Sequence, residues 1–248
     1  IGVGLVGSEM CIRDRYVTPY TNKESQLFLV DLGRGKDRMG GSGLDQTLSY
    51  TNHESPNINK LDDLLSYYEF SQELVRKNIL NAYHDRSDGG LITTLIEMAF
   101  VSNMSVELKS ISKKSKIELI RFLFNEELGG IFAIDKKYEK EFIKLTRKYD
   151  LEAITHNIGN ITKKGKPMLK ITACNYSEPI SKLRKYWSEL SYLIQSERDN
   201  KKTALSEYNT KINSHQTNQE HLIPKLHYRV SGILSLIHIS EPTRPTPI

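Results

Sequence analysis

Cysteine is scarce in this 248-residue chain, which contains only Cys11 and Cys174. Two thiols are too few for a disulfide framework or a four-ligand zinc site, so the sequence indicates a reducing compartment, and we expect a cytoplasmic protein. Cys174 also lacks the flanking glycines of a nucleophile elbow. The composition therefore argues against a disulfide-stabilised scaffold and against thiol catalysis.

Long apolar runs are absent as well. No stretch reaches the roughly 18 consecutive apolar residues that a membrane-spanning helix needs, so we expect no membrane partner. Neither sign of charge is in large excess, because 35 basic residues stand against 30 acidic ones and give a formal net charge of +5. The lysines are scattered and no aromatic-rich RNA motif accompanies them, so we expect no nucleic-acid partner.

The established nucleotide-binding loops are also missing. The glycine-rich stretch 33–36 has no Lys-Ser/Thr at P-loop spacing, and the stretch 40–43 does not follow a strand directly, as a dinucleotide fingerprint does. Backbone N–H groups of both stretches could still wrap a phosphate. The sequence thus contains no classical phosphate-binding loop in these stretches and leaves phosphate binding by them open.

The two ends of the chain lack any core pattern. Residues 1–15 show neither helical nor strand period, and residues 230–248 end in three prolines within seven residues. The strings SEMCIRDR and SLIHISEPTRP resemble translated sequencing-adaptor DNA. We interpret both ends as non-native and leave them out of the fold prediction.

Between the ends, strand and helix patterns alternate. Short apolar runs bounded by turn residues predict strands, and apolar positions with a period near 3.6 predict helices. The expected strands are 27–30, 106–108, 131–134, 154–161 and 168–171. The expected helices are 44–50, 61–79, 91–101, 117–124 and 138–149. This alternation predicts an α/β (α+β) domain in which helices are layered on one sheet.

Two helices carry more detailed expectations. The helix over 61–79 has Asn59 as its expected N-cap and an apolar stripe that we expect to cover the sheet. The members of this stripe are Leu61, Leu64, Leu65, Tyr68, Val75 and Ile79. From residue 178 a second helix has apolar residues at heptad spacing, namely Ile180, Leu183, Trp187, Leu190 and Ile194. The heptad pattern ends at Glu197, which indicates an amphipathic helix packed on a neighbour, followed by a polar linker over 209–220.

The segment HDRSDGG at 84–90 is the most informative polar stretch. It follows a strand or helix end and opens a buried helix, so free backbone N–H groups meet hydroxyl and carboxylate side chains. Phosphate oxygens could accept hydrogen bonds from these N–H groups and from Ser87, while Asp85 could hold Mg²⁺. The alternative is plain capping, with Ser87 or Asp88 as N-cap. His84 and Asp88 are further candidate site residues, and the alternative for His84 is a satisfied structural histidine.

A second polar cluster contains Glu126 and Glu127, between an apolar helix and an apolar strand. These carboxylates could bind a metal ion or position a substrate. The alternative is a solvated helix end.

Together these segments resemble one family. HDRSDGGL at 84–91, EMAF at 97–100 and LFNEELG at 123–129 are similar to phosphoribosylformylglycinamidine synthase of the large, single-chain type. The resemblance extends over roughly 17–229. It covers the second domain that is related to the C-terminal half of aminoimidazole ribonucleotide synthetase, together with the helical connection toward the glutaminase domain.

The resemblance implies a fragment of an ATP- and glutamine-dependent carbon-nitrogen ligase. That ligase converts formylglycinamide ribonucleotide to formylglycinamidine ribonucleotide in de novo purine biosynthesis. The resemblance also implies that Asp85 binds Mg²⁺ and that Ser87 contacts ATP or ADP at an auxiliary site, so we expect no catalytic residue in this chain. Glu126 and Glu127 become candidates for a domain interface near the active site.

The same resemblance implies a domain organisation. Residues 16–176 form the synthetase-like C-terminal domain, 177–213 a helical connection, and 214–229 a linker toward a glutaminase domain. The expected partners are small-molecule substrates and the other domains of the same polypeptide, synthetase domains upstream and the glutaminase downstream. The alternative function is a stand-alone nucleotide-binding or regulatory module without catalysis.

Overall fold

The computed structural model describes residues 21–50, 53–109, 115–163 and 165–213. The ends interpreted as non-native, 1–15 and 230–248, lie outside the described residues, as do Cys11 and the linker expected over 214–229.

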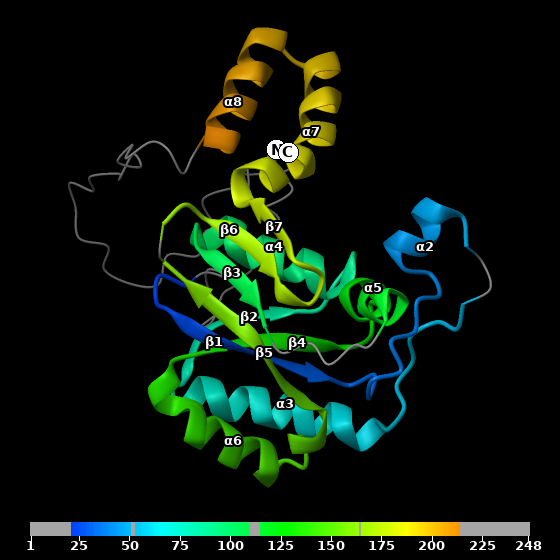
Figure 1. Ribbon diagram of the computed structural model, residues 1–248, viewed down its shortest axis with the longest axis vertical. Helices are drawn as coiled ribbons and strands as arrows, with labels where there is room; N and C mark the ends of the chain where they lie inside the picture. Colours follow the sequence, from blue (N-terminus) through cyan, green and yellow to red (C-terminus); the bar gives the residue numbers. More distant parts are fainter. Residues whose placement is uncertain (1–20, 51–52, 110–114, 164, 214–248) are drawn as a thin grey trace, which may run out of the picture. The chain divides into compact units, whose positions relative to one another are not determined.

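Seven strands form a single sheet in the order β2-β4-β1-β5-β3-β6-β7 (Figure 1). Neighbouring strands are antiparallel, except that β3 and β6 run parallel. The strands are β1 (Ser25–Asp31), β2 (Leu80–Asp85), β3 (Ser105–Leu108), β4 (Gly129–Ile134), β5 (Thr155–Thr162), β6 (Met168–Ile171) and β7 (Tyr176–Pro179). The five expected strands are confirmed. The sequence pattern did not define β2 and β7, which form the two edges of the sheet.

Helices cover both faces of the sheet. They are α2 (Gly43–Leu48), α3 (Leu61–Arg76), α4 (Gly90–Ser102), α5 (Lys116–Phe124), α6 (Glu139–Lys148), α7 (Ile180–Arg198) and α8 (Lys201–Asn213), with short 3-10 turns η1 (Lys136–Tyr138), η2 (Glu152–Ile154) and η3 (Thr172–Cys174). Residues of α4 and α5 pack into one core on one face, and residues of α3 and α6 pack into a second core on the other (Figure 1). The expected layered sheet-and-helix fold is confirmed.

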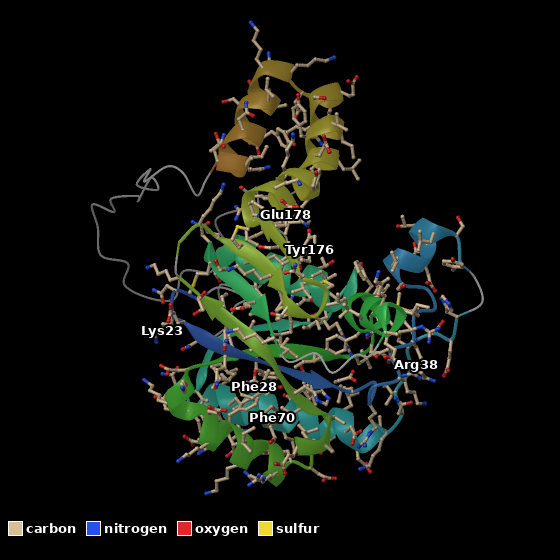
Figure 2. The ribbon with its side chains drawn as sticks, in the orientation of Figure 1. Lys23, Phe28, Arg38, Phe70, Tyr176 and Glu178 are labelled. Carbon is tan, nitrogen blue, oxygen red and sulfur yellow. The ribbon has the colours of Figure 1, made fainter. Side chains whose placement is uncertain are left out.

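The central strand β1 shows why there are two cores. Successive side chains of a strand point to opposite faces, so Leu27 and Leu29 belong to the core under α4, while Phe28 and Val30 belong to the core over α3. Phe28 and Phe70 lie in this second core and are labelled in Figure 2. All four β1 side chains are buried, and such a continuous apolar run is typical of a strand that is covered on both faces.

The helix expected over 61–79 is confirmed as α3, but its predicted face is wrong. Leu61 and Tyr68 are 72% and 62% exposed, and the stripe that packs on the sheet contains Phe70 and Leu74 instead. Asp63 lies on the same buried stripe, where the Arg34 guanidinium donates to both of its carboxylate oxygens at 2.7 and 2.9 Å. Because a charged residue interrupts the buried stripe, its hydrophobic period is hidden in the sequence.

The expected N-cap of α3 is also wrong. Lys60 occupies the N-cap position without a side-chain cap. The Asn59 side chain instead donates to the backbone oxygen of Gly33 at 3.2 Å, which ties the start of α3 to the glycine-rich stretch after β1.

The long helix expected from residue 178 is confirmed as α7, and only its first turns pack on the domain. Ile180 is buried and Leu183 packs against the α4 core, whereas Leu190 and Ile194 are exposed. The Trp187 ring meets the Phe100 ring of α4 at 5.6 Å between centroids. The linker expected over 209–220 is wrong for residues 209–213, which belong to α8, and its remaining residues lie outside the described part. None of the helices in the described ranges is long and apolar enough to cross a membrane.

Candidate functional site

The segment 84–90 forms the end of β2 and a tight turn into α4. Gly89 and Gly90 both adopt positive φ values, 81° and 73°. A Cβ atom on Gly89 would lie 2.2 Å from the Thr93 hydroxyl, and one on Gly90 would lie 2.6 Å from backbone atoms of Phe124 and Asn125. The turn therefore requires two glycines, both for its dihedral angles and for its close approach to the end of α5.

Asp85 and Ser87 lie on the accessible side of this turn. The Asp85 side chain is 70% exposed and approaches the imidazole of its neighbour His84 at 3.3 Å. Ser87 is half-buried, and its backbone oxygen accepts the Gly90 N–H at 2.9 Å, which closes the turn. Within the described ranges no hydrogen bond to the Ser87 hydroxyl is present. A carboxylate and a hydroxyl are thus presented two residues apart at the N-terminal end of a 13-residue helix.

The capping alternative is wrong for both Ser87 and Asp88. Gly89 is the N-cap of α4, and no side chain of the turn caps it. The Gly89 N–H donates to Glu126 Oε1 at 2.7 Å, and the same oxygen accepts the Gly43 N–H at 2.9 Å. Glu126 is half-buried and is therefore not the solvated helix end that we considered. It supplies the negative charge that the first turn of α4 lacks and links that turn to α2.

His84 lies between two carboxylates. Its Nε2 is 3.0 Å from Glu97 Oε2, and its Nδ1 is 3.3 Å from Asp85 Oδ1. Burial lowers the pKa of His84, but the hydrogen bonds and charges of Asp85 and Glu97 outweigh it and raise the pKa from 6.5 to about 9. At neutral pH the ring is a cation with no lone pair to offer. It fixes the end of β2 through these two contacts, and its place among the candidate site residues stays a prediction.

This ion pairing predicts a pH-dependent stability. A folded-state pKa above the unfolded value stabilises the fold in full below pH 6.5, and the stabilisation is lost as pH rises through about 9. We expect His84 to contribute at most about 3 kcal/mol that disappears over this range. Urea unfolding followed by circular dichroism at several pH values measures it. The His84→Gln variant is the control, because it lacks the titrating group, and an identical pH dependence in both proteins would contradict the assignment.

A buried polar network lies beneath the turn. The Arg86 side chain is fully buried, and its Nη2 donates to Asp31 Oδ1 at 2.6 Å and to the Leu128 backbone oxygen at 3.0 Å. Arg86 Nε donates to the Glu127 backbone oxygen at 2.5 Å. The turn is therefore anchored to the end of β1 and to the residues that precede β4.

Glu127 lies inside the fold. Its side chain is 1% exposed, and both of its oxygens accept hydrogen bonds from the Arg38 guanidinium, from Nε at 2.6 Å and from Nη2 at 2.7 Å. A Cβ atom on Gly33 would lie 2.6 Å from the Glu127 carboxyl carbon. This carboxylate is thus neutralised by arginine and enclosed by the glycine-rich stretch, and the alternative of a solvated helix end is wrong.

The glycine-rich stretches direct their N–H groups toward the protein itself. Asp31 accepts the Gly33 N–H at 3.1 Å and the Gly35 N–H at 2.7 Å. Gly40 donates to the Glu54 backbone oxygen at 2.8 Å, and Gly43 donates to Glu126. Because these four N–H groups already donate to acceptors within the protein, they are not free to bind a phosphate, as we considered from the sequence.

Sequence reasoning missed the arginines and Asp31. Arg86 anchors the turn from below, and Arg38 holds the Glu127 carboxylate inside the fold. The available signal was an arginine placed among glycines and carboxylates beside apolar segments. Among the described residues, no group of three or more His, Cys, Asp or Glu side chains is placed to hold a metal ion. Asp85 therefore offers one exposed carboxylate and not a complete metal site.

Comparison with known proteins gives the family of this chain. The family described as AIR synthase related protein, C-terminal domain, matches residues 31–171, more than half of the chain, and the chain belongs to this family. Phosphoribosylformylglycinamidine synthase of Schizosaccharomyces pombe is 34% identical over 193 residues, which are 74% of this chain and 14% of that enzyme. The chain thus spans about one seventh of the length of this relative.

A solved structure shares the fold. Thermotoga maritima PurL complexed with ATP superposes with a TM-score of 0.50 and 13% sequence identity, covering 66% of this chain and 26% of that one. At this identity the likeness concerns the fold alone. The synthetase-like C-terminal domain expected from the sequence is confirmed by the family match and by this fold.

Proposed function

We propose that this chain is part of a phosphoribosylformylglycinamidine synthase, the ATP- and glutamine-dependent ligase of de novo purine biosynthesis. The 34% identity over 193 residues to the Schizosaccharomyces pombe enzyme is the observation that carries this proposal. The match covers only 14% of that enzyme, which supports a role as one domain of a longer polypeptide. The location proposed for that polypeptide is the cytoplasm. Its partners are then synthetase domains upstream and a glutaminase domain downstream, with the small-molecule substrates.

Within that enzyme, the role proposed for this domain is to bind a magnesium nucleotide. Asp85 is an exposed carboxylate, the ligand type that Mg²⁺ prefers, and Ser87 offers a hydroxyl to a phosphate oxygen. When bound, Mg²⁺ would neutralise charge on ATP or ADP. Because Asp85 supplies a single carboxylate, the other ligands must come from the nucleotide, from water and from elsewhere in the polypeptide.

The environment of the turn sets what its groups can do. The N-terminal dipole of α4 favours an anion, but Glu126 already accepts the Gly89 N–H. Nucleotide binding at this turn therefore depends on Ser87 and on a cation held by Asp85, and less on the helix amides. This division of roles makes Asp85 and Ser87 binding residues in the proposal and not catalytic ones.

A domain exchange tests the proposed function. In the chimera, residues 21–213 replace the matching segment of the Schizosaccharomyces pombe enzyme. The chimera is expressed in cells that lack their own phosphoribosylformylglycinamidine synthase. We expect the chimera to restore growth without added purine, because a domain of the same function preserves the site and its contacts. The isolated 248-residue chain is the matched control, and we expect it to form no product with glutamine or ammonia. A stably folded chimera without activity, or turnover by the isolated chain, would contradict the proposal.

A further inference from the structure

Arg86 differs from its neighbours in the turn. Asp85 and Asp88 are exposed and Ser87 is half-buried, whereas the Arg86 side chain has no exposed surface. Its guanidinium contacts the last residue of β1 and the two residues before β4. The Arg86 N–H also donates to the Gly129 backbone oxygen at 2.9 Å. Hydrogen bonds thus fix both the backbone and the side chain of Arg86, which lies between Asp85 and Ser87, the two residues proposed to contact the ligand.

This arrangement decides the direction of the flanking side chains. Successive side chains at the end of an extended strand point to opposite sides, so an inward Arg86 places Asp85 and Ser87 outward together. Arginine stays protonated and offers a rigid planar set of donors, which locks its position more tightly than a flexible lysine would. Movement of the turn would separate this buried charge from Asp31, and an unpaired buried charge is strongly destabilising.

Stability alone does not explain the buried ion pair between Arg86 and Asp31. Among the described residues, Arg86 Nη1 is buried without a hydrogen-bond acceptor. A buried donor without an acceptor is unfavourable, and well-packed apolar side chains often replace a buried ion pair without loss of stability. The geometry points to a task beyond holding the core together.

We infer that Arg86 is a positioning residue, which holds the turn between β2 and α4 so that Asp85 and Ser87 reach the same magnesium nucleotide. The inference rests on the proposed function of this turn. Arg86 itself stays beneath the turn, contacts no ligand and acts only through its two neighbours. A change at Arg86 should therefore weaken ligand affinity in protein that is still folded.

The test compares two buried arginines in the complete polypeptide that carries this chain. Arg86→Lys keeps the charge but loses the planar donor set. Arg38→Lys is the matched control, because Arg38 is also buried and makes two hydrogen bonds to one carboxylate, yet it does not adjoin Asp85 or Ser87. Binding of ADP is titrated with and without Mg²⁺ at a temperature where each variant is folded. The number of sites and the dissociation constant are determined separately.

We expect Arg86→Lys to raise the dissociation constant of MgADP about tenfold or more with an unchanged number of sites, since residues that orient metal ligands have effects of this size. The gain in ADP affinity on adding Mg²⁺ should shrink in parallel. We expect Arg38→Lys to lower the melting temperature and to leave this dissociation constant within about twofold. If Arg86→Lys folds poorly, Asp31→Asn weakens the same anchor while Arg86 remains, and it should raise the constant in the same direction.

Three results would overturn the inference. The first is an Arg86→Lys protein that binds MgADP as the wild type does, while Asp85→Asn does not. The second is an equal loss of affinity in the Arg86 and Arg38 variants, which would indicate a general structural role. The third is a fall in the number of sites at constant affinity. A wild-type protein that binds no MgADP is a different outcome, because it overturns the proposed function and the positioning role with it.

Discussion

Replacing Arg38 by methionine should lower the free energy of unfolding by about 3–5 kcal/mol, the loss that follows when one partner of a buried ion pair is removed. Arg38 donates to both oxygens of Glu127, and both side chains are at least 95% buried. Without the guanidinium, the Glu127 carboxylate stays buried against Gly33 and loses both the charge and the two hydrogen bonds that Arg38 supplies. Since a mesophilic domain has a total stability of about 5–15 kcal/mol, this loss is large enough to unfold much of the protein on mild heating.

Urea unfolding followed by far-ultraviolet circular dichroism measures this loss. The control is Arg147→Met, because Arg147 pairs with Glu152 at 2.8 Å on the surface, where 65% and 50% of the two side chains are exposed. Solvent screens such a pair, so we expect little change in the control. Equal effects of the two substitutions would show that burial of the Arg38 pair has no bearing on stability.

The second large effect concerns Asp85. In the complete polypeptide, Asp85→Asn should weaken binding of MgADP by about 100-fold or more, because loss of a direct ligand exceeds the roughly 10- to 100-fold effect of residues that only orient ligands. The substitution removes a negative charge opposite a divalent cation. The side chain is 70% exposed, so we expect stability to fall only by the part of the His84 ion pairing that Asp85 supplies.

Ser87→Ala and Asp88→Asn complete this comparison. Loss of one hydrogen bond to a charged phosphate costs about 1.5 kcal/mol or more, so Ser87→Ala should weaken binding about tenfold. Asp88→Asn removes the same charge as Asp85→Asn from the same turn and should leave the affinity unchanged or slightly higher. Bound nucleotide and magnesium are measured in each purified protein beside its melting curve. Normal content of both in Asp85→Asn would reject the ligand assignment.

The strands and helices of the layered fold were predictable where a single hydrophobic pattern, either a continuous apolar run or a helical period, dominates the segment. β1 and β4 are continuous apolar runs, because helices cover both of their faces. The edge strands were not defined, since β2 contains His84 and Asp85 and β7 is polar and largely exposed. The face of α3 was missed for another reason: Asp63 is buried through its pairing with Arg34, and this depends on a residue 29 positions away.

The site shows a similar division. The turn at 84–90 was predictable because its glycines and polar residues precede an apolar helix without charge except Glu97. The buried polar network beneath the turn was not predictable. Its members Asp31, Arg86 and Glu127 come together only when β1, β2 and β4 lie in one sheet. For the same reason the sequence suggested a side chain of the turn as the cap of α4, whereas the oxygen that accepts the Gly89 N–H belongs to Glu126, 37 residues further along.

The position of β1 in the sheet has a consequence for synthesis on the ribosome. Among the described strands of the sheet, β1 leaves the ribosome first, yet its two neighbours are β4 and β5, the nearer of which in sequence begins roughly 100 residues later. At translation rates of about 5–20 residues per second, the apolar segment of β1 waits about 5–20 s for its first partner. During that time Leu27, Phe28, Leu29 and Val30 have no sheet to join. A nascent chain stalled before residue 129 should therefore bind general chaperones, and release of that binding should coincide with the emergence of β4.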